Sequence, residues 1–224
     1  ATNGVFVGYQ AGANVTTGSG NTCVGLNAGD AITTSPSNTL IGHNAGSAIS
    51  TGTGENVVIG NNAAASMTTG AQNIMIGDNA AAGAAVTGIR NVAVGDNALY
   101  NVAGGGGNIV LGYTAGHAIN SGNNNVALGT AAGAALTSGH ENTYIGNNAG
   151  ASATTAGYNI CIGNGAGNGG TTTGDHNIVM GHAAGDALTS ASNNIIIGQS
   201  AGTTLSTGAS NVAIGAEALY YQTT

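Results

Sequence analysis

The chain has 224 residues, of which 42 are glycine and only 4% are charged, and its formal net charge is −7. Arg90 is the single basic residue, so the chain cannot neutralise a phosphate backbone or an anionic lipid surface, and we expect no nucleic-acid partner. No apolar run approaches the ~20 residues of a spanning helix, so we expect no membrane insertion. Collagen is excluded because glycine does not recur at every third position.

An aliphatic residue or methionine followed by glycine recurs along the whole chain. These glycines, called marker glycines below, are 17 or 18 residues apart: Gly8, Gly25, Gly42, Gly60, Gly77, Gly95, Gly112, Gly129, Gly146, Gly163, Gly181, Gly198 and Gly215. The unbroken register predicts one repetitive domain over residues 1–224 rather than separate globular domains.

Each repeat has the same elements in chain order. A Val, Ile or Thr stands three residues before the marker glycine and an aliphatic residue directly before it, which predicts a strand with one face buried. An alanine follows three residues after the marker glycine, and the next residue is usually glycine, which predicts a corner with positive φ. A second short apolar segment, such as the one at Ile32 or Leu136, then ends in Thr-Thr-Gly or a variant, which is typical of a turn.

Two short strands and two glycine-bearing corners make one coil of a solenoid. The sequence therefore predicts an all-β fold, a parallel β-solenoid or β-roll of thirteen 17–18-residue coils. With neighbouring coils about 4.8 Å apart, thirteen of them would form a rod roughly 60 Å long.

Asparagine stands four residues before the marker glycine in all repeats except the first. Stacked coils would superpose these amides into a ladder, in which each side chain donates to one neighbour and accepts from the other. Its members are Asn21, Asn38, Asn56, Asn73, Asn91, Asn108, Asn125, Asn142, Asn159, Asn177, Asn194 and Asn211. A partial second ladder is predicted at Asn27, Asn44, Asn62, Asn79, Asn97 and Asn148. We favour a structural role for these amides over a sugar-binding face.

The predicted core is thin, because much of the apolar content is alanine. Association of several chains would bury more apolar surface and cover open faces, which favours a bundle of three. The sequence also has no polar capping segment, which solenoids normally need. We therefore expect either a segment of a longer fibre or a filament unit that stacks end to end.

The repeats resemble two groups of fibrous proteins. Units such as Asn125-Val-Ala-Leu-Gly129 are similar to the head repeats of trimeric autotransporter adhesins, and units ending Ala98-Leu-Tyr-Asn101 or Ala218-Leu-Tyr-Tyr221 are similar to repeats of bacteriophage tail fibres and related viral or bacterial fibre proteins. The resemblance extends over essentially the whole chain and carries over no catalytic residue. It implies a homotrimeric fibre shaft, located outside the cell or on a virion or cell surface, that supplies reach, rigidity and attachment.

Few residues suggest chemistry. Asp78 and Asp96 follow marker glycines in adjacent repeats, so their carboxylates would either repel each other or attract a cation, and they are weak candidates for a metal site. The five histidines lack the spacing of zinc ligands. No nucleophile–base pair or phosphate-binding loop is evident, so we expect no enzyme, no metal and no cofactor.

Cys23 and Cys161 both stand two residues before a marker glycine. Eight coils separate them, nearly 40 Å at about 4.8 Å per coil, which excludes a disulfide within one solenoid. We expect both to be small buried thiols.

The leading hypothesis is a non-enzymatic structural fibre shaft, and an extracellular filament subunit that stacks end to end is the second. Two binding functions stay open. Thr pairs such as Thr16-Thr17 would stack into a hydroxyl ladder that could face ice, although adjacent threonines in a strand point to opposite faces. Outward Asn, Thr and Tyr side chains, including Tyr9, Tyr113 and Tyr158, could instead bind a cell-surface glycan or receptor.

Overall fold

The computed structural model describes residues 3–170 and 173–221. The chain contains two compact units, Ala1–Asn108 and Ile109–Thr224, and each of them is a stack of coils. The single repetitive domain over residues 1–224 stays a prediction.

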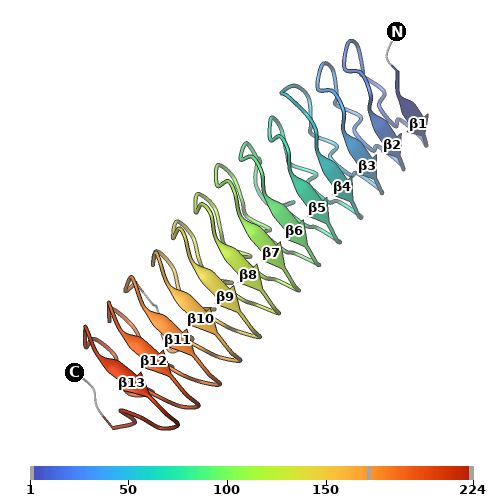
Figure 1. Ribbon diagram of the computed structural model, residues 1–224. Helices are drawn as coiled ribbons and strands as arrows, with labels where there is room; N and C mark the ends of the chain where they lie inside the picture. Colours follow the sequence, from blue (N-terminus) through green and yellow to red (C-terminus); the bar gives the residue numbers. More distant parts are fainter. Residues whose placement is uncertain (1–2, 171–172, 222–224) are drawn as a thin grey trace. The chain divides into compact units, whose positions relative to one another are not determined.

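Each coil contributes one strand of three residues, and neighbouring strands within a unit pair in parallel (Figure 1). The first unit holds β1 (Val5–Val7), β2 (Thr22–Val24), β3 (Thr39–Ile41), β4 (Val57–Ile59), β5 (Ile74–Ile76) and β6 (Val92–Val94). The second holds β7 (Ile109–Leu111), β8 (Val126–Leu128), β9 (Thr143–Ile145), β10 (Ile160–Ile162), β11 (Ile178–Met180), β12 (Ile195–Ile197) and β13 (Val212–Ile214).

The register keeps every repeat in the same phase. Ile74 pairs with Val92 in the first unit, and Ile109 pairs with Val126 in the second, so equivalent residues stack on one another. The predicted fold class is thereby confirmed: the protein is an all-β parallel β-solenoid.

The predicted second strand of each coil is wrong for the residues that the structure describes. The second apolar segment is a turn, as at Ile32, whose amide donates to the carbonyl of Gly29 three residues earlier at 3.1 Å. Thr33, the next residue, donates to Ser50 of the following coil at 2.9 Å. The segment therefore bonds partly to itself and partly to its neighbour, and none of its described residues belongs to a strand.

The strands alternate between an inward and an outward face, but the inward residue is the central one. Leu40, Val58 and Met75 are completely buried, whereas Ile41 and Ile74 are exposed. The aliphatic residue before the marker glycine and the one two positions earlier thus point outward. This corrects the expectation that their alternation marks the buried face.

The interior of a coil is narrow, and the size of its buried strand residue is balanced against the size of its corner residue. In the third coil a Cβ added to Gly46 would come within 3.0 Å of the Leu40 side chain, so the large strand residue of this coil leaves no room for a side chain at the corner. In the sixth coil the strand residue is Ala93, and the corner residue is the fully buried Leu99. Limited interior space explains why the remaining aliphatic side chains lie outside.

The corners explain the glycine pattern. Marker glycine Gly77 has φ +138°, and a Cβ there would lie 2.5 Å from the carbonyl oxygen of Gly95, the next marker glycine. At the predicted corner, four residues after the marker glycine, the φ angle is positive whether or not the residue is glycine: it is +58° at Gly12 and +54° at Leu99. The predicted positive φ is confirmed at that corner.

Candidate functional site

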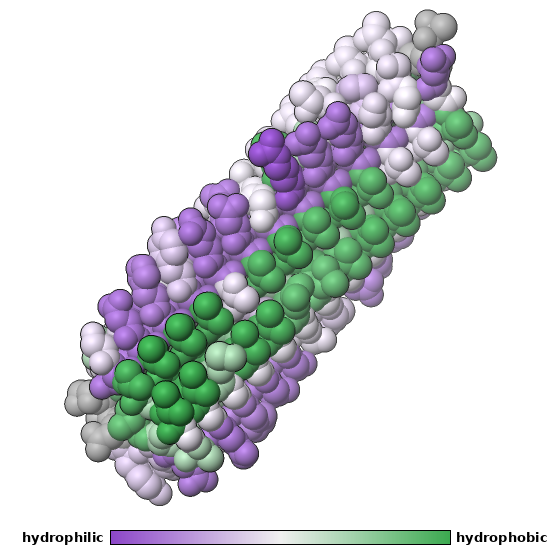
Figure 2. All heavy atoms as spheres, viewed as in Figure 1, coloured by the Kyte–Doolittle hydropathy of each residue, from purple (hydrophilic) through white to green (hydrophobic). Residues whose placement is uncertain are grey.

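The outward residues of the strands form a continuous aliphatic surface on each unit. We call this surface the outer face and define it as the first and third residues of each strand. Figure 2 shows aliphatic side chains of neighbouring coils side by side in both units. In the first unit the outer face consists of Val5, Val7, Thr22, Val24, Thr39, Ile41, Val57, Ile59, Ile74, Ile76, Val92 and Val94. In the second it consists of Ile109, Leu111, Val126, Leu128, Thr143, Ile145, Ile160, Ile162, Ile178, Met180, Ile195, Ile197, Val212 and Ile214.

The outer face carries no charged residue, because none of the thirteen strand segments of the described chain contains Asp, Glu, Lys or Arg. Its side chains are substantially open to solvent: Ile109 is 45% exposed and Leu111 is 42% exposed. Contiguous exposed apolar surfaces of this kind mark interaction sites in soluble proteins.

The composition of the strands indicates this apolar outer face, whereas the alternation of residues along a strand does not. In ten of the thirteen strands all three residues are apolar, and the other three begin with Thr. Parallel strands that are covered on both faces read as continuous apolar runs. The sequence pattern is therefore that of a sheet with a second covered face.

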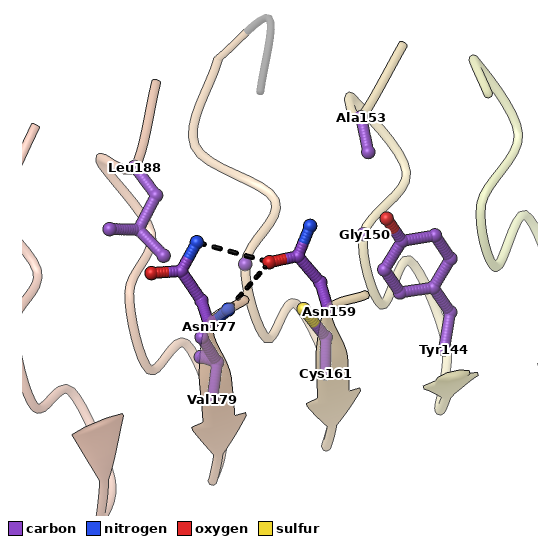
Figure 3. Close-up of a pocket in the computed structure, with 9 residues that line it drawn as sticks. Tyr144, Gly150, Ala153, Asn159, Cys161, Asn177, Val179 and Leu188 are labelled. Atoms are coloured by element: carbon purple, nitrogen blue, oxygen red, sulfur yellow. Dashed lines mark hydrogen bonds between the residues drawn. The ribbon is translucent and has the colours of Figure 1, made fainter. Parts of the chain in front are cut away.

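The asparagines four residues before the marker glycines lie inside the coils and are hydrogen-bonded from coil to coil. In the first unit the backbone N–H and Nδ2 of Asn38 donate to Oδ1 of Asn21 at 2.9 and 3.0 Å, and Asn21 Nδ2 donates to the carbonyl of Ser35 at 2.9 Å. In the second unit Asn177 donates in the same way to Asn159 at 2.8 and 3.0 Å (Figure 3). These amides satisfy buried corner groups that water cannot reach.

The second set of asparagines is joined only in part. Nδ2 of Asn27 donates to Asn44 at 3.1 Å, and Nδ2 of Asn44 donates to Asn62 at 3.0 Å. Asn148 instead donates to its chain neighbour Asn147 at 2.7 Å. Asn79 and Asn97 are joined to the preceding coil by backbone hydrogen bonds: their N–H groups donate to the carbonyls of Asn61 and Asp78, each at 3.0 Å.

The threonine hydroxyls after the second apolar segment also point to the neighbouring coil. Thr16 donates to the carbonyl of Thr33 at 2.9 Å, Thr137 donates to that of Thr154 at 3.1 Å, and Thr189 donates to that of Ser206 at 3.0 Å. Their donor hydrogens are used within the solenoid, which reduces what they can offer to an ice surface.

Asp78 and Asp96 lie at the end of a polar row on the first unit. Nδ1 of His43 contacts Asn61 Oδ1 at 2.9 Å, Asn61 Nδ2 donates to Asp78 at 2.9 Å, and the backbone N–H of Asp78 donates to an Asp96 carboxylate oxygen at 3.3 Å. Because Asn61 uses its amide nitrogen toward Asp78, its Oδ1 is the acceptor and His43 holds its proton on Nδ1. Over residues 3–170 and 173–221, no group of three or more potential ligands is arranged to hold a metal ion.

Cys23 and Cys161 are buried free thiols. Burial raises the pKa of Cys23 to about 11 and the pKa of Cys161 to about 12, because a thiolate loses its hydration inside the coil. Neither thiol is therefore activated as a nucleophile.

The exposed tyrosines differ in their surroundings. Tyr9 and Tyr113 are 70% and 58% exposed. Tyr158 lies between two histidines of the neighbouring coils: its ring stacks on His176 with centroids 4.8 Å apart, and the His140 ring stands edge-on at 5.0 Å. The stacked His176 ring covers one of the two ring faces that a sugar could use, and the sequence spacing alone did not reveal this contact.

The fold defines the class of this protein as a tandem-repeat parallel β-solenoid. Comparison with family models, with curated proteins and with solved structures finds no match to the chain. The described residues also form no helix that is long and apolar enough to cross a membrane.

Proposed function

We propose that this chain is a non-enzymatic structural fibre protein that associates with further copies of itself through the outer face. It supplies reach, rigidity and attachment at a cell or virion surface. The observation that carries this proposal is the outer face itself, an uncharged aliphatic surface that runs over successive coils in each unit.

Copies of the same chain fit this surface better than an unrelated partner does. The side-chain rows of every copy repeat with the same strand spacing, about 4.8 Å, so within each unit the outer faces of two copies match coil by coil when the chains run parallel. Cyclic symmetry brings the same patch of each copy to a shared axis. A trimer closes three such faces around one axis, as the resemblance to trimeric fibre repeats implies.

The inner contacts support a structural role. The buried amide ladder and the threonine hydroxyls direct their hydrogen bonds from one coil to the next, which stiffens each stack. The outer face contains only three hydroxyl side chains, Thr22, Thr39 and Thr143, so it lacks the regular hydroxyl array expected of an ice-binding surface.

Light scattering after size exclusion tests the proposal. We expect a stable species near three times 21.1 kDa. Ile195→Glu places a charge on the outer face and should yield smaller species, whereas Ser190→Glu introduces the same charge at an exposed site outside the strands and should not. A wild-type monomer of 21.1 kDa would refute self-association, and a mass that grows with concentration would indicate an end-to-end filament.

A further inference from the structure

The interior of the second unit contains a small cavity beside the ring of Tyr144 (Figure 3). Its wall includes Ala153, Asn159, Cys161 and Leu188. The centre of a water molecule can move within a volume of about 10 Å³ inside this cavity. That volume is about the minimum that holds one water molecule.

The cavity results from an unusual distribution of side-chain volume. Tyr144 is the inward residue of β9 and is fully buried, whereas the inward residues of β8 and β10 are Ala127 and Cys161. Seven residues after the marker glycine the preceding coil has Leu136, whereas this coil has Ala153 and the following coil has Gly170. The large ring occupies much of the space that the smaller residues leave, but its shape does not fill that space completely.

The cavity is polar on one side. The Tyr144 hydroxyl is buried and makes no hydrogen bond of ordinary geometry, although the Asn159 side chain lies close enough to interact with it. Figure 3 shows it on the same side as the amide of Asn159. The Asn159 amide nitrogen donates to the carbonyl of Gly174 at 2.8 Å, which uses one of its two hydrogens. Burial raises the pKa of Tyr144 well above its usual value, so its hydroxyl keeps its proton and needs an acceptor.

We propose that this cavity is a binding site for one ordered water molecule. The water accepts a hydrogen bond from the Tyr144 hydroxyl, and Asn159 and the Cys161 thiol are its other polar neighbours. A buried water with two or more polar partners satisfies groups that would otherwise stay unpaired, and water of this kind is part of a folded structure.

A crystal structure of the full chain, at a resolution that reveals ordered solvent, tests the proposal directly. We expect a density peak within about 3 Å of the Tyr144 hydroxyl oxygen. The peak should be absent from the Tyr144→Phe variant and present in Tyr158→Phe, which removes an exposed hydroxyl from the same unit. A wild-type cavity without density would overturn the proposal.

Urea unfolding of the same variants gives a second measurement. If water pairs the hydroxyl, Tyr144→Phe loses that interaction and its unfolding midpoint falls below the wild-type value. If the cavity is dry, the substitution removes an unpaired buried donor and the midpoint rises, a result that would also overturn the proposal. Tyr158→Phe should leave the midpoint unchanged.

Discussion

The buried amide ladder can be tested at a single rung, Asn56. Its Nδ2 donates to Asn38 Oδ1 at 2.9 Å and to the carbonyl of Gly70 at 3.0 Å, and its Oδ1 accepts the backbone N–H of Asn73 at 3.0 Å. Asn56→Ala removes all three interactions. It leaves two backbone groups inside the coil, one carbonyl and one N–H, without these partners.

The size of the effect follows from those two groups. An unsatisfied buried donor or acceptor costs about 1–3 kcal/mol, so we expect Asn56→Ala to lower the free energy of unfolding by roughly 2–6 kcal/mol. Asn61→Ala is the matched control in the same coil, because Asn61 is exposed and its side-chain bonds lie at the surface. A surface substitution of this kind should change the free energy of unfolding by no more than about 0.5 kcal/mol.

Urea unfolding followed by circular dichroism measures both variants. The protein concentration has to be the same throughout, because any self-association adds a concentration-dependent contribution to stability. If Asn56→Ala and Asn61→Ala differ by less than about 1 kcal/mol, the amide ladder does not stabilise the coils and the reasoning is refuted.

Three further outcomes are expected. Gly77→Ala, whose Cβ would meet a backbone carbonyl at 2.5 Å, should destabilise the protein by roughly 3 kcal/mol or more, whereas Gly104→Ala, with no atom within 4 Å of the added Cβ, should leave the urea midpoint unchanged. The raised thiol pKa values, about 11 for Cys23 and about 12 for Cys161, predict that stability falls as pH rises above the ordinary value of 9.0, because the unfolded chain loses these protons first; urea midpoints across that pH range measure it. Trypsin should cut the unfolded chain into two fragments at Arg90 but cut the native protein slowly, since the Arg90 amide is bonded to Ala71 at 3.2 Å; electrophoresis of timed digests shows both.

The repeat, the corners and the amide positions could be predicted because each is a residue that stacks on its own copies. Gly77 approaches the next marker glycine so closely that only glycine fits, and Asn56 accepts a hydrogen bond from Asn73, the asparagine of the next coil. A contact between equivalent residues imposes the same residue type on every coil. Such positions appear in the sequence as strict periodicity.

The direction of the strand faces could not be predicted from the same pattern. Val57, Val58 and Ile59 are all apolar, so binary patterning does not distinguish the buried central residue from its outward neighbours. The volume inside the coil determines which of the three residues is buried. That volume depends on the turns that close the coil, which lie outside the strand. The predicted second strand was wrong for a related reason: an apolar segment of two or three residues does not reveal whether its amides bond to the next coil or back to their own turn.

Asn194, directly before β12, and Ile195, the first residue of β12, should therefore affect different properties. Asn194 points inward, donates to Asn177 at 3.0 Å and to Gly208 at 2.9 Å, and is fully buried, whereas Ile195 lies on the outer face and is 37% exposed. Asn194→Ala should lower the urea midpoint and leave that midpoint dependent on protein concentration, because the outer face is intact. Ile195→Glu should abolish the concentration dependence and preserve the circular dichroism spectrum of the coils. If Ile195→Glu unfolds with the same concentration dependence as the wild type, the outer face is not the surface through which the chains associate.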